Sequence, residues 1–180
     1  MVSNSLTRRE VSIRLMSILS AIGFLGKAKA VSPETSSTGD DGISRTCECI
    51  HQEVVIKASR ARLYQALTDG KQFGRVTDLV MPGSGASAFI SPDVGGAFSI
   101  FRGVITGRHI EMIPSERLVQ AWRVKEWVEG IYSIVRFQLS DQDSDTKLVF
   151  DHTGFPQGKA EHLASGWKEH YWAPLQKYLS

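Results

Sequence analysis

The sequence has little of what marks metal-bound, nucleotide-binding or membrane-spanning proteins. It contains two cysteines in 180 residues, and no Cys/His group has the spacing of a structural zinc site. No glycine-rich loop opens a predicted helix, as a phosphate-binding loop would. The longest apolar stretch holds about a dozen residues, short of the roughly 20 that a membrane-spanning helix needs. We therefore expect no metal, no cofactor and no stable membrane anchor.

Outside its first thirty residues, the sequence also lacks an excess of positive charge. Those thirty residues carry five of the 21 basic residues and one of the 19 acidic ones, which leaves 16 basic and 18 acidic residues in the rest. A slightly acidic chain without a Lys/Arg cluster has little electrostatic attraction for nucleic acid. We therefore expect no nucleic-acid partner.

Residues 1–30 have the three-part layout of a signal peptide. A basic stretch comes first, an apolar stretch follows over residues 15–26, and the small-residue site Ala28-Lys29-Ala30 comes last. The pair Arg8-Arg9 resembles part of a twin-arginine export signal, and ordinary secretion stays open. We expect a periplasmic or secreted protein. The alternative is a cytoplasmic protein in which this stretch is an amphipathic first helix.

A polar segment separates this stretch from the folded domain. Residues 31–46 are rich in Ser, Thr, Gly and Asp, the composition of a flexible linker, so the domain is expected over residues 47–180. Cys47 and Cys49 stand at its start. In an oxidising compartment they would form a strained bridge, pair with another chain or remain two incidental thiols, and the sequence leaves these alternatives open.

The start of the domain predicts one strand and two short helices. The β-branched run over residues 53–57 is typical of a strand. Ser59 is a candidate N-cap for the first helix, and Thr68-Asp69 for a second helix that carries Phe73 and Val76.

Six strands and a long helix follow. Alternating apolar residues, such as every second residue from Ser133 to Leu139, predict an antiparallel sheet with one buried face. Residues 159–179 have an apolar stripe at four-residue spacing, which predicts a closing helix, and Pro174 predicts a kink near residues 169–172. The expected fold class is α+β, a helix-grip fold in which a curved antiparallel sheet wraps around the long C-terminal helix.

Several segments give the domain a resemblance to a known family. They are LYQALTD, GGAFSIFRGVITGRHIEMIP, RLVQAWRVKEW, YSIVRFQL, TKLVFDHTGFP and GWKEHYWAPLQKYL. From about residue 54 onward the chain resembles the carboxy-terminal domain of the activators of heat-shock protein 90 ATPase, a branch of the START-like, SRPBCC or birch-allergen-like superfamily. The resemblance implies a helix-grip fold. It leaves the function open, because relatives range from chaperone activators to lipid carriers and aromatic-ring cyclases.

Ten inward-facing side chains are candidates for lining a ligand cavity between the sheet and the closing helix. They are Phe98, Ile100, Trp122, Val135, Phe137, Phe150, His152, Leu163, Trp167 and Tyr171. The alternative is that they fill a solid core. His152 would either offer a general base to the cavity or be a hydrogen-bonded structural residue. His162 and His170, two helical turns apart, are expected on a solvated face.

Three classes of function follow from these observations. The first is an exported protein that binds a hydrophobic small molecule in the cavity. The second, which the resemblance implies, is an interaction module of the chaperone-activator type with a protein partner. The third is a cyclase- or hydrolase-like enzyme, which would need at least two polar groups converging near His152. The sequence assigns no catalytic residue.

Overall fold

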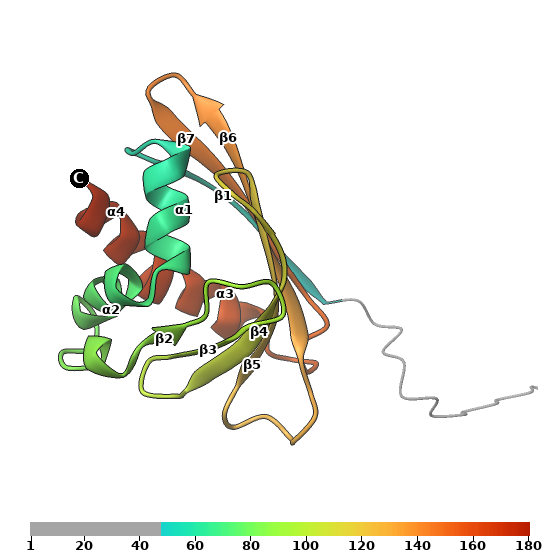
Figure 1. Ribbon diagram of the computed structural model, residues 1–180. Coiled ribbons are helices and arrows are strands. Elements are labelled where there is room, and N and C mark those ends of the chain that lie inside the picture. The colour runs from blue at the N-terminus through green and yellow to red at the C-terminus, as the bar shows by residue number, and fades with distance from the viewer. Residues whose placement is uncertain (1–47) are drawn as a thin grey trace, which may run out of the picture. The chain divides into compact units, whose positions relative to one another are not determined.

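A curved, seven-stranded antiparallel sheet forms the centre of the domain. The computed structural model describes residues 48–180, and the strand order in the sheet is β1-β7-β6-β5-β4-β3-β2. The helices of this part of the chain lie on one face of the sheet (Figure 1). The predicted α+β helix-grip architecture is confirmed. The predicted signal peptide, the linker and Cys47 lie outside the described residues.

The strands follow one another as a meander, except that β1 joins the sheet beside β7. Their bounds are β1 (Cys49–Ile56), β2 (Phe89–Ile90), β3 (Ala97–Ile100), β4 (Ile105–Ile113), β5 (Arg117–Val124), β6 (Ser133–Gln142) and β7 (Asp145–Thr153). The first strand begins four residues before the predicted run, because the alternation of buried and exposed side chains extends back to Ile50. The six later strands agree with the six predicted.

The two faces of the sheet differ in polarity, as the alternation predicts. In β6, Val135 and Phe137 are fully buried on the inner face, whereas Ile134 is exposed on the outer face. The outer face carries ion pairs, for example between Arg136 of β6 and Asp151 of β7 at 2.6 Å. The core therefore lies between the inner face of the sheet and the helices.

Two short helices lead from β1 to the rest of the sheet. The bounds are α1 (Arg60–Thr68) and α2 (Gly70–Asp78), followed by the 3₁₀ turn η1 (Gly85–Ser87). Both predicted caps are present: the Ser59 side chain accepts a hydrogen bond from a backbone N–H of α1, and Asp69 accepts one from the Gln72 N–H of α2. Such caps satisfy N–H groups that have no partner within the helix.

The closing helix consists of three consecutive segments. They are α3 (Ala160–Trp167), the π-helical turn η2 (Lys168–Trp172) and α4 (Ala173–Leu179). Pro174 has no N–H to donate and its ring crowds the preceding turn, so the α-helical pattern fails just before it. The irregularity that Pro174 predicted near residues 169–172 is therefore found as a π turn. No helix within residues 48–180 is long and apolar enough to cross a membrane.

Candidate functional site

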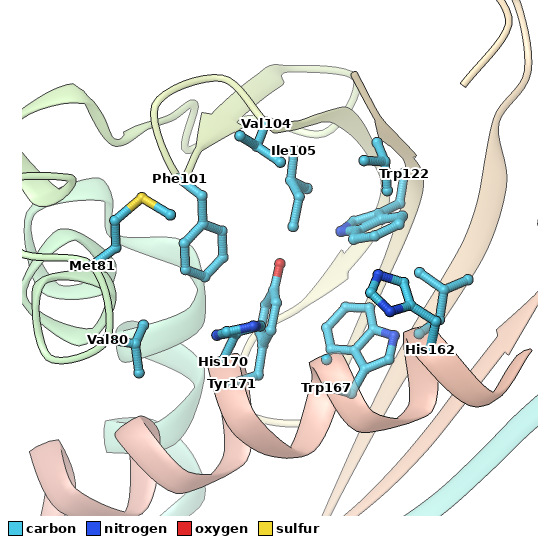
Figure 2. A pocket seen from close by; sticks show the side chains of 13 residues that line it. Val80, Met81, Phe101, Val104, Ile105, Trp122, His162, Trp167, His170 and Tyr171 are labelled. Carbon is cyan, nitrogen blue, oxygen red and sulfur yellow. The ribbon is translucent and has the colours of Figure 1, made fainter. Parts of the chain in front are cut away.

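A pocket of about 240 Å³ opens between the closing helix and the β4–β5 part of the sheet. The helix supplies one wall, β4 and β5 supply the opposite wall, and the loops before η1 and after β3 form the rim (Figure 2). The lining side chains are mostly apolar. They are Val80, Met81, Phe101, Val104, Ile105, Trp122, Val124, His162, Leu163, Gly166, Trp167, His170 and Tyr171.

A left-handed turn shapes the rim of this pocket. Phe101, Arg102 and Gly103 have φ angles of 51°, 56° and 78°. Such angles are uncommon for residues with a side chain, above all for a bulky aromatic, and local strain of this kind gathers at binding and catalytic sites. Arg102 fixes the turn because its Nη2 donates to the carbonyl of Pro82 at 2.9 Å. The hydrogen bond joins the two loops of the rim.

Two polar atoms of the lining residues are buried away from solvent, the Trp122 indole Nε1 and the Tyr171 hydroxyl. Burial raises the pKa of the Tyr171 hydroxyl, which therefore stays protonated, and the neighbouring Trp122 N–H opposes this effect. Figure 2 shows the two side chains beside Ile105. The exposed polar side chains among the lining residues are those of His162 and His170.

Behind the pocket, a chain of hydrogen bonds connects α3 to three strands. Trp167 Nε1 donates to His152 Nδ1 at 3.0 Å. An indole nitrogen only donates, so Nδ1 must be unprotonated and the ring proton sits on Nε2. This Nε2 lies 2.7 Å from Ser133 Oγ, which in turn donates to the Trp122 carbonyl at 2.9 Å. We call Trp167, His152, Ser133 and Trp122 the relay.

The relay accounts for both nitrogens of His152. Burial lowers the pKa of His152 from 6.5 to about 3, because a charged imidazole would lose its hydration without gaining an anionic partner. In a protonated ring Nδ1 would also carry a proton, so two N–H donors, those of His152 and Trp167, would face each other. His152 is therefore neutral and hydrogen-bonded to the protein at both ends, which leaves no ring nitrogen for a general base.

The ten predicted cavity residues separate into three groups. Trp122, Leu163, Trp167 and Tyr171 line the pocket. Phe98, Ile100, Phe137 and Tyr171 border a second space of only about 10 Å³, so their side chains occupy nearly all of this region. The remaining three residues are buried and line neither space: Val135, Phe150 and His152. Whether any of them binds a ligand stays a prediction.

Most of the rim was not found from the sequence. Phe101 and Val104 reach the pocket through a left-handed turn that no sequence pattern announces, and Val80 and Met81 reach it through an irregular loop. His162, Gly166 and His170 are different, because they form a second four-residue stripe directly beside the apolar stripe of Leu163, Trp167 and Tyr171. That spacing carried a usable signal. The two histidines are exposed, as expected, but they also border the pocket.

Comparison with known proteins identifies the family to which this domain belongs. A sequence profile of the family described as "Activator of Hsp90 ATPase homolog 1-like protein" matches residues 57–180. The chain belongs to this family. It is 26% identical over 152 residues to "Activator of 90 kDa heat shock protein ATPase homolog 1" of Mus musculus, an alignment that covers 84% of this chain and 42% of the relative. The human protein of the same name is 26% identical over 132 residues, 73% of this chain and 37% of that protein.

Solved structures show the same fold. The crystal structure of an HSP90 activator from Plasmodium falciparum superposes with a TM-score of 0.66 at 25% identity, covering 73% of this chain and 95% of that one. The solution structure of the Aha1 dimer from Colwellia psychrerythraea gives a TM-score of 0.59 at 19% identity, with 73% and 96% covered, and supports the fold alone. The chain spans less than half the length of the curated relatives named above. This member of the activator family has the START-like helix-grip fold.

We predict that His152 makes the protein less stable as the pH falls from about 6.5 toward 3. In this window the unfolded chain binds a proton on residue 152 and the folded protein does not, so the free energy of unfolding decreases with falling pH. The limiting slope is somewhat more than ~1 kcal/mol per pH unit. His152→Asn keeps an acceptor for Trp167 and removes the titrating ring, so its slope is smaller.

Denaturant unfolding at a series of pH values measures both slopes. Burial also lowers the pKa of His109, but His109 is present in both proteins and cancels in the comparison. Equal slopes in the parent protein and His152→Asn would contradict the neutral, buried state of His152.

Proposed function

We propose that this protein binds a compact hydrophobic small molecule in the pocket between α3 and strands β4 and β5. The observation that carries the proposal is the pocket itself, a space of about 240 Å³ lined mostly by apolar side chains. An apolar cavity of roughly 150 Å³ already admits benzene. The space therefore suits a molecule of one or two rings.

The walls and rim support this proposal in two further ways. No lysine or arginine is among the lining residues, so a highly charged ligand would lose its hydration without ion pairs in return. The strained turn at Phe101 lies directly at the rim and is tied down by Arg102. Strain of this kind persists only where the surrounding structure enforces it, and it is frequent at ligand sites.

We predict that Gly166→Leu abolishes ligand binding, whereas Gly166→Ala preserves it. Gly166 lines the pocket, and the nearest heavy atom to an added Cβ is His170 Cδ2, 3.9 Å away. A methyl group fits there without a clash, and alanine should stabilise the helix by up to ~1 kcal/mol. A leucine side chain at the same position extends into the pocket and fills it.

The measurement is native mass spectrometry of the protein purified from its host, with the two variants as a matched pair. We expect a discrete apolar adduct on the parent protein and on Gly166→Ala, and none on Gly166→Leu. Thermal unfolding of all three proteins serves as the folding control. An adduct that persists on a folded Gly166→Leu variant would place the ligand elsewhere, and a bare parent chain would count against the proposal.

We further propose that the protein acts after export, as the layout of residues 1–30 indicates. The expected product is a mature chain that begins at Val31, after the small-residue site, in the periplasm or outside the cell. Fractionation of the host cells and sequencing of the mature amino terminus test this. An intact Met1 in the cytosolic fraction would overturn it.

A second candidate function is an interaction with a chaperone of the heat-shock protein 90 class. Family membership supports it, because the curated relatives are named as activators of that ATPase. The loop between β5 and β6, together with the start of β6, adds a surface of suitable character. Val128 is 73% exposed, and Ile131 and Tyr132 of the loop and Ile134 of β6 are also exposed. Exposed apolar groups close together in one segment are typical of protein-contact surfaces.

We expect that, under this second candidate, the purified chain raises the ATP hydrolysis rate of its host's heat-shock protein 90. Val128→Asp should reduce the increase, because the charge would lose hydration at the contact. Gly166→Leu should leave it unchanged, since the pocket lies elsewhere. A steady-state ATPase assay with and without the chain decides, and an unchanged rate excludes this candidate.

A further inference from the structure

We propose that the pocket selects an amphipathic carboxylic acid, with one or two rings inside the pocket and a carboxylate at its mouth that accepts a hydrogen bond from His170. This inference rests on the proposed small-molecule binding and adds the chemical class of the ligand. The polar end is assigned to the mouth because His162 and His170 carry the exposed polar side chains of the lining. Figure 2 shows them at the two ends of the helical wall, with Trp167 between them.

Both imidazoles can interact with a ligand. The other three histidines of the chain each have a side-chain partner in the protein. The rings of His162 and His170 have neither a hydrogen bond nor an ion pair to any of residues 48–180, and both side chains are exposed. An imidazole carries at least one N–H in either protonation state, so each ring can donate to an acceptor.

Of the two, His170 is better placed to contact a group at the mouth. Helical side chains lean toward the N-terminal turn, which directs His170 toward Gly166 and His162 away from it. The geometry agrees, because His170 Cδ2 lies 3.9 Å from the position that a Cβ of residue 166 would occupy. The His170 ring also packs on Phe101 of the rim, with 6.3 Å between the ring centroids. The ring is thus held between the rim and Gly166, where the absence of a side chain leaves space for a ligand group.

The charges around the mouth favour an anion. The lining contains no acidic residue, and the two loops of the rim, residues 79–84 and 101–104, contain one charged residue, Arg102. The glutamates beside the two histidines in the sequence do not line the pocket, and one of them, Glu169, accepts a hydrogen bond from Ser165 at 2.6 Å. A carboxylate accepts a stronger hydrogen bond than a neutral carbonyl, whereas an ammonium group would find no anionic partner in the lining.

A carboxylate at the mouth also keeps its charge in contact with water. Deeper in the pocket the walls include the buried side chains of Trp122, Leu163 and Trp167, against which a charge would lose its hydration. At the mouth, one carboxylate oxygen can face His170 while the other stays hydrated. The ligand therefore has a single acidic group at one end of an apolar body.

The test compares 2-naphthoate with its neutral analogue 2-naphthamide on the full chain. Isothermal titration calorimetry measures both probes with the parent protein and with His170→Phe, which keeps an aromatic ring beside Phe101 and removes the N–H donor. The quantity of interest is the change that the mutation causes for each probe, because the probes themselves differ in hydration. We expect His170→Phe to weaken 2-naphthoate about fivefold and 2-naphthamide by less than about twofold.

His162→Phe is the matched control. It makes the same exchange at an exposed lining position eight residues earlier, where the side chain leans away from Gly166. The affinity for 2-naphthoate should change by less than about twofold. Gly166→Leu tests the location, because it should abolish the binding of both probes by filling the pocket. Thermal unfolding of the three variants serves as the folding control.

The outcomes separate this inference from the proposed function. If both probes bind and His170→Phe changes them by the same factor, the acid assignment is wrong while the pocket remains a binding site. A larger loss of 2-naphthoate affinity in His162→Phe, or tighter binding of 2-naphthylmethylamine than of 2-naphthoate, would also overturn it. Binding of 2-naphthoate to a folded Gly166→Leu variant would place the acid outside the pocket. If no probe binds the parent protein, small-molecule binding in this pocket fails, and the acid assignment fails with it.

Discussion

The hydrogen bond from Trp167 to His152 is the contact on which the arrangement of the closing helix depends. The indole N–H of Trp167 in α3 reaches into the core and donates to His152 in β7. His152 then donates to Ser133 in β6, and Ser133 donates to the Trp122 carbonyl in β5. Each donor in this relay has one acceptor and the direction is fixed at its start, because an indole nitrogen only donates. The relay therefore determines the tautomer of His152 and links the closing helix to the sheet through a directed set of hydrogen bonds.

A second polar contact fixes the same helix from the side of β1. The Gln52 amide donates to the Ala164 carbonyl at 3.0 Å, and its oxygen accepts a hydrogen bond from the Trp172 indole. The helix is thus attached through polar groups to β1 and β7 at one side of the sheet, and its approach to β4 and β5 at the other side rests on apolar contacts. The pocket lies on this second side. The position of the polar contacts explains why the space opens there.

The sequence predicted the elements well and the pocket poorly, for physical reasons. Strand alternation, the caps at Ser59 and Asp69 and the break before Pro174 are local patterns that depend on few residues, so they can be recognised without knowing the fold. The rim depends on the left-handed turn at Phe101 and on its contact with Pro82, which arise only when distant segments meet. His152 illustrates the same limit: its place on the inner face follows from alternation, but its two partners come from β6 and α3.

Fold alone does not choose between a small-molecule carrier and a chaperone-activator module, because one architecture hosts many functions. The decisive feature is the pocket of about 240 Å³ between the closing helix and strands β4 and β5. A carrier needs such a space for its ligand, whereas a protein-contact surface on the outside of the domain does not. The pocket is therefore the observation that supports the carrier over the interaction module.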